Sequence, residues 1–208
     1  MGFDLNEALY SLPGILIGFA FHEFAHAQTA AIFGDDTPRL QGRTTLNPLI
    51  HIDIIGFLMM LLAGFGWAKP VQINPNNFKN RKRDDFFVSL AGPLINFAIA
   101  FLFVLLIKLF SYFPQILDKA TYDILMNILD YTVWINVVLF VLNLLPIPPL
   151  DGSHILFGLT GLSDSPVYFR IQQMSTVIFF ILIITNFLDK IIGPPILYIY
   201  DLLTSLFF

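Results

Sequence analysis

Apolar residues along the chain fall into long uncharged segments that are separated by short polar stretches. Four of these segments are long enough to cross the hydrocarbon core of a bilayer as helices: about residues 9–33, 86–107, 131–150 and 171–188. A fifth segment, about 191–208, contains two prolines and Asp201. It is therefore either a final span or an interfacial helix.

Residues 52–67 are also apolar, but at about 24 Å they are short for a spanning helix. Seven of the eleven Lys and Arg residues lie between positions 34 and 85 and flank this segment on both sides. A crossing would place one basic flank outside the cell, against the positive-inside tendency. We therefore expect a re-entrant segment with both flanks cytoplasmic. Irregular backbone at that depth requires a cover of protein or a water-filled cavity.

Composition agrees with a membrane protein. Of the 208 residues 56% are hydrophobic and only 12% are charged, whereas a soluble domain is about one quarter charged. The sequence predicts an all-α polytopic membrane protein with five to six membrane segments, one of them re-entrant. The chain has no cysteine, which excludes disulfides and thiolate metal sites.

The first apolar segment holds a polar cluster, His22-Glu23-Phe24-Ala25-His26. On a helix, residues four apart share a face, so both imidazoles can reach one metal ion. In this HExxH spacing Glu23 can act on the metal-bound water as a general base. Between residues 12 and 33 no other side chain is ionisable, and a carboxylate at membrane depth is costly. The pattern predicts a catalytic metal site rather than two packing histidines.

Two histidines leave a catalytic zinc ion one protein ligand short. The remaining candidates are His51, Asp53, Asp151 and His154. Asp151 follows a proline-rich break in an apolar segment and precedes Gly152, which permits close approach of another chain segment. We expect Asp151 to be the ligand, the alternative being a helix cap or turn residue. His154 is expected in an outer position, and His51 with Asp53 form either a pair near the site or an interfacial turn.

Three motifs occur in order in three apolar segments. They are the HExxH, the run Ala91-Gly92-Pro93-Leu94-Ile95-Asn96, and the pattern Asn143…Pro146…Leu150-Asp151-Gly152. Together they resemble the site-2 protease family of intramembrane zinc metalloproteases. The resemblance is closest to the compact bacterial and archaeal branch, in which residues 42–53 and 66–71 also recur. We expect a single intramembrane metalloprotease domain over 1–208, without a PDZ or CBS module. Its catalytic core is about 9–160, followed by C-terminal membrane segments at about 171–208.

The resemblance implies one Zn²⁺ per chain, bound by His22, His26 and Asp151. It implies hydrolysis of peptide bonds in or near the transmembrane segments of protein substrates, with Glu23 as general base. Asn143 would donate a hydrogen bond to the oxyanion, although asparagines also hold membrane helices together. The expected location is the plasma membrane of a prokaryote, with the active site toward the cytoplasm.

Residues 71–74 alternate apolar and polar side chains between Pro70 and Pro75. This pattern is typical of a short edge strand. A substrate helix must unwind before cleavage, and we expect the extended substrate to pair with this membrane-associated β-strand. The basic run at residues 79–83 is expected to anchor the chain at lipid headgroups rather than to bind nucleic acid.

Two other functions fit the sequence less well. A transporter or a metal-binding protein that holds clients without cleaving them has no need of Glu23 beside the metal, and we find no internal repeat of the transporter type. A structural zinc scaffold would close the fourth coordination position, for which only His154 or His51 remain. His and carboxylate ligands also accept cobalt or manganese. The substrate, the scissile bond and the oligomeric state are not specified by the sequence.

Overall fold

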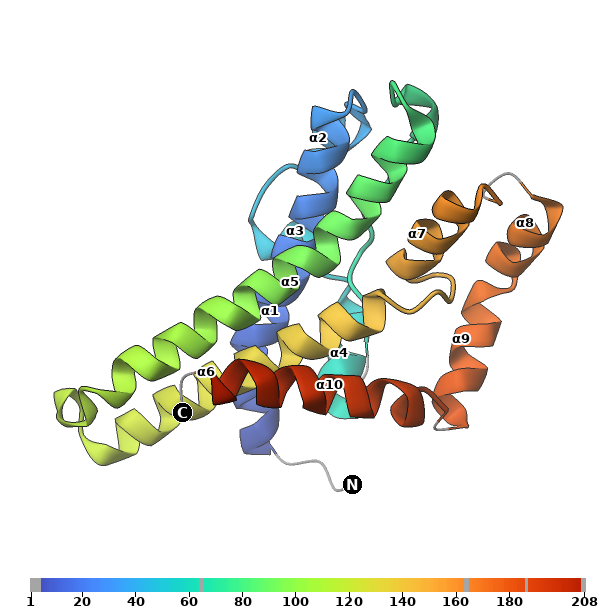
Figure 1. Ribbon diagram of the computed structural model, residues 1–208. Helices are drawn as coiled ribbons and strands as arrows, with labels where there is room; N and C mark the ends of the chain where they lie inside the picture. Colours follow the sequence, from blue (N-terminus) through green and yellow to red (C-terminus); the bar gives the residue numbers. More distant parts are fainter. Residues whose placement is uncertain (1–4, 64–65, 163–164, 186, 207–208) are drawn as a thin grey trace.

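A computed structural model describes residues 5–63, 66–162, 165–185 and 187–206, and most of them lie in helices (Figure 1). The helices are α1 (Leu5–Ile32), α2 (Thr37–Leu40), α3 (Pro48–His51), α4 (Ile54–Ala63), η1 (Pro75–Asn77), α5 (Arg81–Ser111), η2 (Pro114–Ile116), α6 (Lys119–Asn143), α7 (Asp151–Thr160), α8 (Pro166–Gln173), α9 (Ser175–Ile184) and α10 (Phe187–Ser205). The all-α class predicted from the sequence is confirmed.

Three long helices, α1, α5 and α6, form a bundle in which each packs against the other two. α5 and α6 run antiparallel and are joined through η2, and α1 lies against both (Figure 1). A cluster of buried apolar residues from α5, α6 and α10 fills one part of the bundle: Ala100, Val104, Ile107, Leu129, Val133, Val137, Val141, Ile196 and Leu203. α10 packs along α6 at this cluster.

Within the described residues, α1 from Asn6 to Ile32, α5 and α6 are long and apolar enough to cross a membrane. A fourth span requires α8 and α9 to count as one helix pair bent by 57°. The expected five to six membrane segments are therefore not confirmed. α10 carries Asp189, Lys190 and Asp201, and these charges interrupt the apolar stretch that a span needs.

The predicted span at 131–150 has the wrong limits at both ends. α6 begins at Lys119, because the Asp118 side chain accepts a hydrogen bond from the Thr121 amide and caps the helix. It ends at Asn143, before the prolines of the 144–150 turn. The length of an uncharged run depends only on amino-acid composition. A helix, by contrast, begins and ends where its backbone is capped or interrupted.

The re-entrant interpretation of residues 52–67 has a structural counterpart. α4 has only ten residues, which is about 15 Å and half the thickness of a bilayer core. Its flanks lie side by side, because Ile52 forms an antiparallel bridge with Ala68 and the Lys69 amide donates to the His51 carbonyl at 2.8 Å. The buried Arg43 guanidinium also donates to the carbonyls of Ile50 and Lys69, one on each flank.

The expected strand at residues 71–74 is not confirmed, because in the described part of the chain no neighbouring backbone pairs with it. The side chains of this segment nevertheless alternate between half-buried and exposed. Val71 and Ile73 are half-buried, and Gln72 and Asn74 are exposed. A strand requires a partner, and the flanking α1 offers side chains rather than a free backbone edge.

Candidate metal centre

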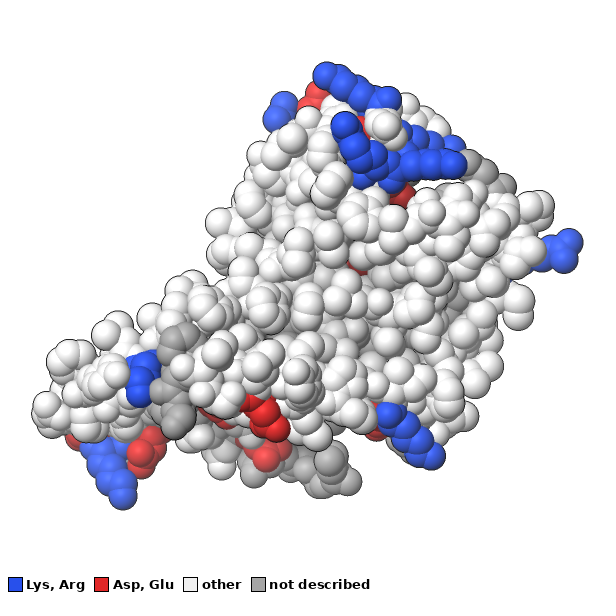
Figure 2. Space-filling view, viewed as in Figure 1, with Lys and Arg blue, Asp and Glu red and all other residues white. Residues whose placement is uncertain are grey.

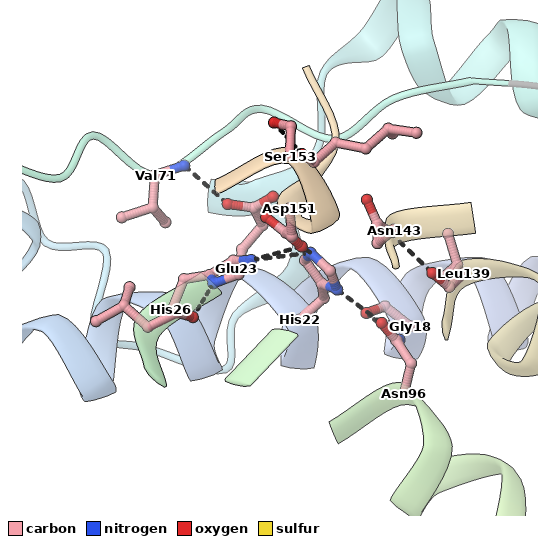
Figure 3. A network of polar contacts seen from close by, with 12 residues as sticks. Gly18, His22, Glu23, His26, Val71, Asn96, Leu139, Asn143, Asp151 and Ser153 are labelled. Atoms are coloured by element: carbon pink, nitrogen blue, oxygen red, sulfur yellow. Dashed lines mark hydrogen bonds and ion pairs between the residues drawn. The ribbon is translucent and has the colours of Figure 1, made fainter. Parts of the chain in front are cut away.

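Two histidines of α1 and one aspartate of α7 converge on one point, which Figure 3 shows from close by. His22 and His26 lie one helical turn apart, and their Nε2 atoms are 3.0 Å from each other. The Asp151 Oδ2 atom lies 3.2 Å from His22 Nε2 and 3.3 Å from His26 Nε2. Among the described residues, the three side chains form the one group of metal-ligating type with this proximity.

The geometry of the three atoms suits a metal ion. Zinc bonds of 2.0–2.1 Å in a tetrahedron place neighbouring ligand atoms about 3.3 Å apart, close to the 3.0–3.3 Å between these three atoms. Asp151 Oδ2 is buried and has no hydrogen-bond partner. A buried carboxylate oxygen without a donor is costly unless a cation is there to meet it. The donor set therefore fits a zinc ion with a fourth position open.

Both imidazoles are oriented through their other ring nitrogen. His22 Nδ1 lies 2.7 Å from the Asn96 Oδ1 atom, and His26 Nδ1 lies 2.7 Å from the Val88 carbonyl oxygen. Both partners are acceptors, so each Nδ1 carries the hydrogen and each Nε2 presents its lone pair to the centre. This tautomer is the one a metal ligand requires.

Asp151 reaches the centre because the chain turns sharply between α6 and α7. Asp151 is the first residue of α7, so its carboxylate stands at that helix's N-terminus. A Cβ atom on Gly152 would overlap the carbonyl oxygens of Leu144 and Leu145. Only glycine fits so close an approach. The Asp-Gly pair thus closes the turn and places the carboxylate against α1.

Gly92 of α5 packs directly against the two imidazoles. A Cβ atom there would lie 2.7 Å from His22 Nε2 and closer still to His26 Nε2. The sequence motif that contains Gly92 gives no sign that this residue borders the metal position. That contact joins residues about 70 positions apart, which local spacing does not encode.

A buried network of amides links this centre to the bundle. Asn96 Nδ2 donates to the Gly18 carbonyl at 3.1 Å and to Asn136 Oδ1 at 3.0 Å. Asn136 in turn donates to the Thr132 carbonyl at 2.9 Å, and both asparagines are fully buried. Asn96 thus satisfies the Gly18 carbonyl of α1 as well as the ring nitrogen of His22.

Glu23 lies beside the cluster and is as buried as the two histidines, with 8% of its surface exposed. Its Oε2 atom accepts a hydrogen bond of 2.8 Å from the Val71 amide (Figure 3). In the described part of the chain no hydrogen bond engages Oε1. One carboxylate oxygen is thus anchored, which leaves the other for a water molecule.

The other candidates lie elsewhere. His154 Nδ1 is 3.8 Å from Asp85 Oδ2, and its side chain is 37% exposed. Asp53 Oδ1 accepts from the Gly56 amide at 2.9 Å, as a capping residue at the start of α4. His51 is fully buried and its Nε2 lies 2.7 Å from the Thr45 carbonyl. The structure thus places Asp53 in the turn that begins α4, away from the three ligand atoms.

Asn143 is the last residue of α6, near the cluster but not directed into it (Figure 3). Its Nδ2 atom donates to the Leu139 carbonyl of the preceding turn at 3.0 Å. A role at the oxyanion therefore requires this side chain to leave that bond when substrate arrives.

Comparison with known proteins agrees with the motifs. The model of peptidase family M50 matches residues 10–185. YwhC of Bacillus subtilis, named as a zinc metalloprotease, is 36% identical over 197 residues, which cover 92% of this chain and 88% of the relative. Rip2 of Mycolicibacterium smegmatis, also named as a zinc metalloprotease, is 29% identical over 184 residues, covering 86% and 68%. A similarly named protein of Methanocaldococcus jannaschii is 30% identical over 154 residues, covering 74% and 72%.

No solved structure matches the chain significantly. The family match extends over far more than half of the chain and includes the HExxH motif, the AGPxxN motif and the Asp-Gly turn. The structure brings these three motifs to one place. The chain therefore belongs to peptidase family M50, the site-2 protease family that its motifs resemble.

Proposed function

We propose that this zinc metalloprotease cleaves transmembrane protein substrates inside the membrane, with a zinc ion held by His22, His26 and Asp151. The observation that carries the proposal is the position of three ligand atoms 3.0–3.3 Å apart, one of them a buried carboxylate oxygen without a donor. When bound there, zinc lowers the pKa of a water molecule and polarises the scissile carbonyl.

The protein side chains divide the remaining work. Glu23 Oε1 would take the proton of the attacking water and pass it to the leaving amine nitrogen. The Val71 amide holds Oε2 at 2.8 Å, so the carboxylate keeps one orientation while its other oxygen acts. Asn143 would donate to the oxyanion after releasing the Leu139 carbonyl.

The depth of the site supports cleavage within the membrane. His22 and His26 lie in the C-terminal half of α1, and Glu23 is nine residues before the helix end at Ile32, about 14 Å along the axis. Figure 2 shows Lys and Arg side chains gathered at the end of the molecule where α2 and the start of α5 lie. By the positive-inside tendency this end is cytoplasmic. We infer a prokaryotic plasma-membrane protein whose site receives water from the cytoplasm.

Residues 71–74 offer free backbone for a substrate. Their outer amides are engaged, since Val71 donates to Glu23 and Asn74 donates to Asp35. Within the described residues, no hydrogen bond engages the amides of Gln72 and Ile73. An unwound substrate segment that pairs with the free edge of residues 71–74 by β-addition would lie next to Glu23.

A proline scan tests this pairing. Gln72→Pro and Ile73→Pro each remove one free amide, and we expect each to reduce cleavage at least tenfold with zinc still bound. Gln72→Ala is the matched control, because it removes the side-chain bond to Gln41 but keeps the amide. Loss of zinc together with cleavage in the proline variants would indicate a folding defect and refute the pairing.

The proposed reaction is tested by reconstituting the protein in liposomes with single-pass peptides that have an Ala/Leu core and one Asn-Gly pair. We expect wild type to release two fragments cut within the core and Glu23→Gln to release none, while both hold zinc. Equal cleavage by Glu23→Gln would remove Glu23 from the mechanism. A zinc-loaded wild type that cleaves no peptide of the set, but holds them, would favour the client-binding alternative.

A further inference from the structure

Asp35 is a buried carboxylate just beyond the end of α1 that no part of the proposed mechanism uses. It is fully buried, and four donors converge on its two oxygens. Oδ1 accepts from the Thr37 amide at 3.1 Å, the Thr37 hydroxyl at 2.6 Å and Asn77 Nδ2 at 2.7 Å. Oδ2 accepts from the Asn74 amide at 2.7 Å.

Two of these donors come from a distant part of the chain. The Thr37 bonds are a local turn of the kind that Asp commonly forms, whereas Asn74 and Asn77 are 39 and 42 residues away. Burial alone would raise the pKa of Asp35, but the hydrogen bonds from Thr37, Asn74 and Asn77 outweigh it and hold the pKa below its ordinary value. Asp35 is therefore held as a carboxylate anion, and hydrogen bonds to an ionised acceptor are stronger than those between two neutral groups.

The segment 71–74 is thus held at both ends by carboxylates of α1 and of the turn that follows it. Glu23 of α1 accepts from Val71 at one end, and Asp35 accepts from Asn74 at the other. The unpaired amides of Gln72 and Ile73 lie between the two anchors. An anchor at one end would leave the segment free to pivot about Val71.

We propose that Asp35 is a positioning residue that fixes the register of residues 71–74 against α1, and so determines which peptide bond of a paired substrate lies at the metal. The proposal rests on the β-addition put forward above. A shift of one residue along a strand is about 3.3 Å, and it turns the opposite set of side chains toward the site. Attack requires the reacting atoms about 3–3.5 Å apart, so a one-residue shift selects a different bond.

Asp35→Asn is the informative substitution. An amide side chain has one acceptor oxygen, so its NH₂ group must face either the Asn74 amide or the Thr37 and Asn77 donors. Asp36→Asn is the matched control, because the neighbouring Asp36 side chain is 61% exposed and pairs with Arg39 at 3.1 Å on the surface. Neither substitution touches the metal ligands.

Register can be measured without catalysis, because the chain has no cysteine of its own. Gln72→Cys is introduced into the Glu23→Gln protein, in which the new side-chain amide oxygen can still accept from Val71, and Ala/Leu peptides carry one cysteine at successive positions. We expect disulfide formation at one peptide position when Asp35 is intact, with or without Asp36→Asn, and at three or more positions with Asp35→Asn. The same single position in Asp35→Asn would overturn the proposal.

Cleavage mapping by mass spectrometry supplies the second readout. Asp35→Asn should retain zinc, lose at least tenfold in kcat/KM and cut at neighbouring bonds, while Asp36→Asn cuts as wild type does. A slower cut at the wild-type bond alone would make Asp35 merely structural. If Asp35→Asn loses zinc, Asn77→Ala replaces it as the test variant, because this substitution removes one hydrogen-bond donor to Asp35 Oδ1. Cleavage by Asn77→Ala at the wild-type bond alone would then contradict the proposal. Failure of β-addition is distinct, since no peptide position would then crosslink to Gln72→Cys even with Asp35 intact.

Discussion

The two ends of the α1–α5–α6 bundle are held together by different interactions. At the metal end, the amide of Asn96 on α5 joins His22 and Gly18 of α1 to Asn136 of α6. At the other end, Val104 of α5 packs among apolar residues of α6 and α10. The same helix α5 takes part in both, and the change occurs within about two turns.

The difference reflects what each end must do. Lipid is as apolar as a leucine side chain, so packing in a membrane rests on shape rather than on the hydrophobic effect. Directional hydrogen bonds fix rotation and distance, which three ligand atoms of one metal ion require. Substitutions at the metal end should therefore change zinc affinity, whereas substitutions at the apolar end should change stability alone.

The largest effect is expected for Gly92→Ala. Its Cβ atom would overlap His26 Nε2 and lie 2.7 Å from His22 Nε2, so the imidazoles must move and the ligand triangle is lost. We expect zinc affinity to fall by more than about 100-fold, beyond the range for lost supporting contacts, as measured by competition with a chelator. Gly158→Ala is the control, because a Cβ there meets nothing within 4 Å. Tight zinc binding by Gly92→Ala would refute the close packing.

Asn96→Ala should come next. It removes the acceptor that orients His22 and the donor to Gly18 and Asn136. Loss of such a supporting contact lowers metal affinity or activity by about 10–100-fold. The same chelator competition measures it, with cleavage of the Ala/Leu peptides as a second readout. An unchanged affinity would show that the network holds helices without orienting the ligand.

Val104→Ala tests the apolar end. Val104 is fully buried, and loss of two methyl groups should reduce the free energy of unfolding by about 1–2 kcal/mol through lost packing. Zinc affinity of the folded protein should remain that of wild type. Unfolding in detergent and chelator competition on the same sample measure both quantities. A tenfold change in the zinc affinity of Val104→Ala would contradict the claim that the apolar end affects stability alone.

The smallest expected effect is the pH dependence of the stability that Asp35 contributes to the fold. Its pKa lies below the ordinary value of 3.8 in the folded protein, so Asp35 stabilises the fold fully at pH values above about 4. That contribution is lost as pH falls through the lower folded pKa. The difference in Tm between wild type and Asp35→Asn should accordingly shrink on acidification below about pH 4. A difference that grows on acidification would contradict the assigned hydrogen bonds.

The sequence predicted what depends on local geometry. The His22 and His26 spacing places both rings on one helical face wherever the helix lies, and the flanking basic residues indicated that residues 52–67 return to their starting side. Asp151 was expected from the Asp-Gly turn and the family motif, and the structure brings it to the two histidines.

The sequence did not predict contacts between distant helices. Gly92 against the imidazoles, Asn96 on His22 and Asp35 on Asn74 join residues 39 to 74 positions apart, and no periodicity records which helix faces meet. The limits of α6 were missed because the charged residues near its start are compatible with helix once Asp118 caps it. The strand expected at 71–74 lacks a neighbour to pair with among the described residues.

The most direct test is the metal content of detergent-purified protein, measured by mass spectrometry of zinc. Wild type is expected to hold about one zinc per chain, His26→Ala and Asp151→Ala to hold almost none, and His154→Ala to hold as much as wild type. Full zinc retention in Asp151→Ala would contradict the three-ligand site and move the third ligand away from the α7 N-terminus.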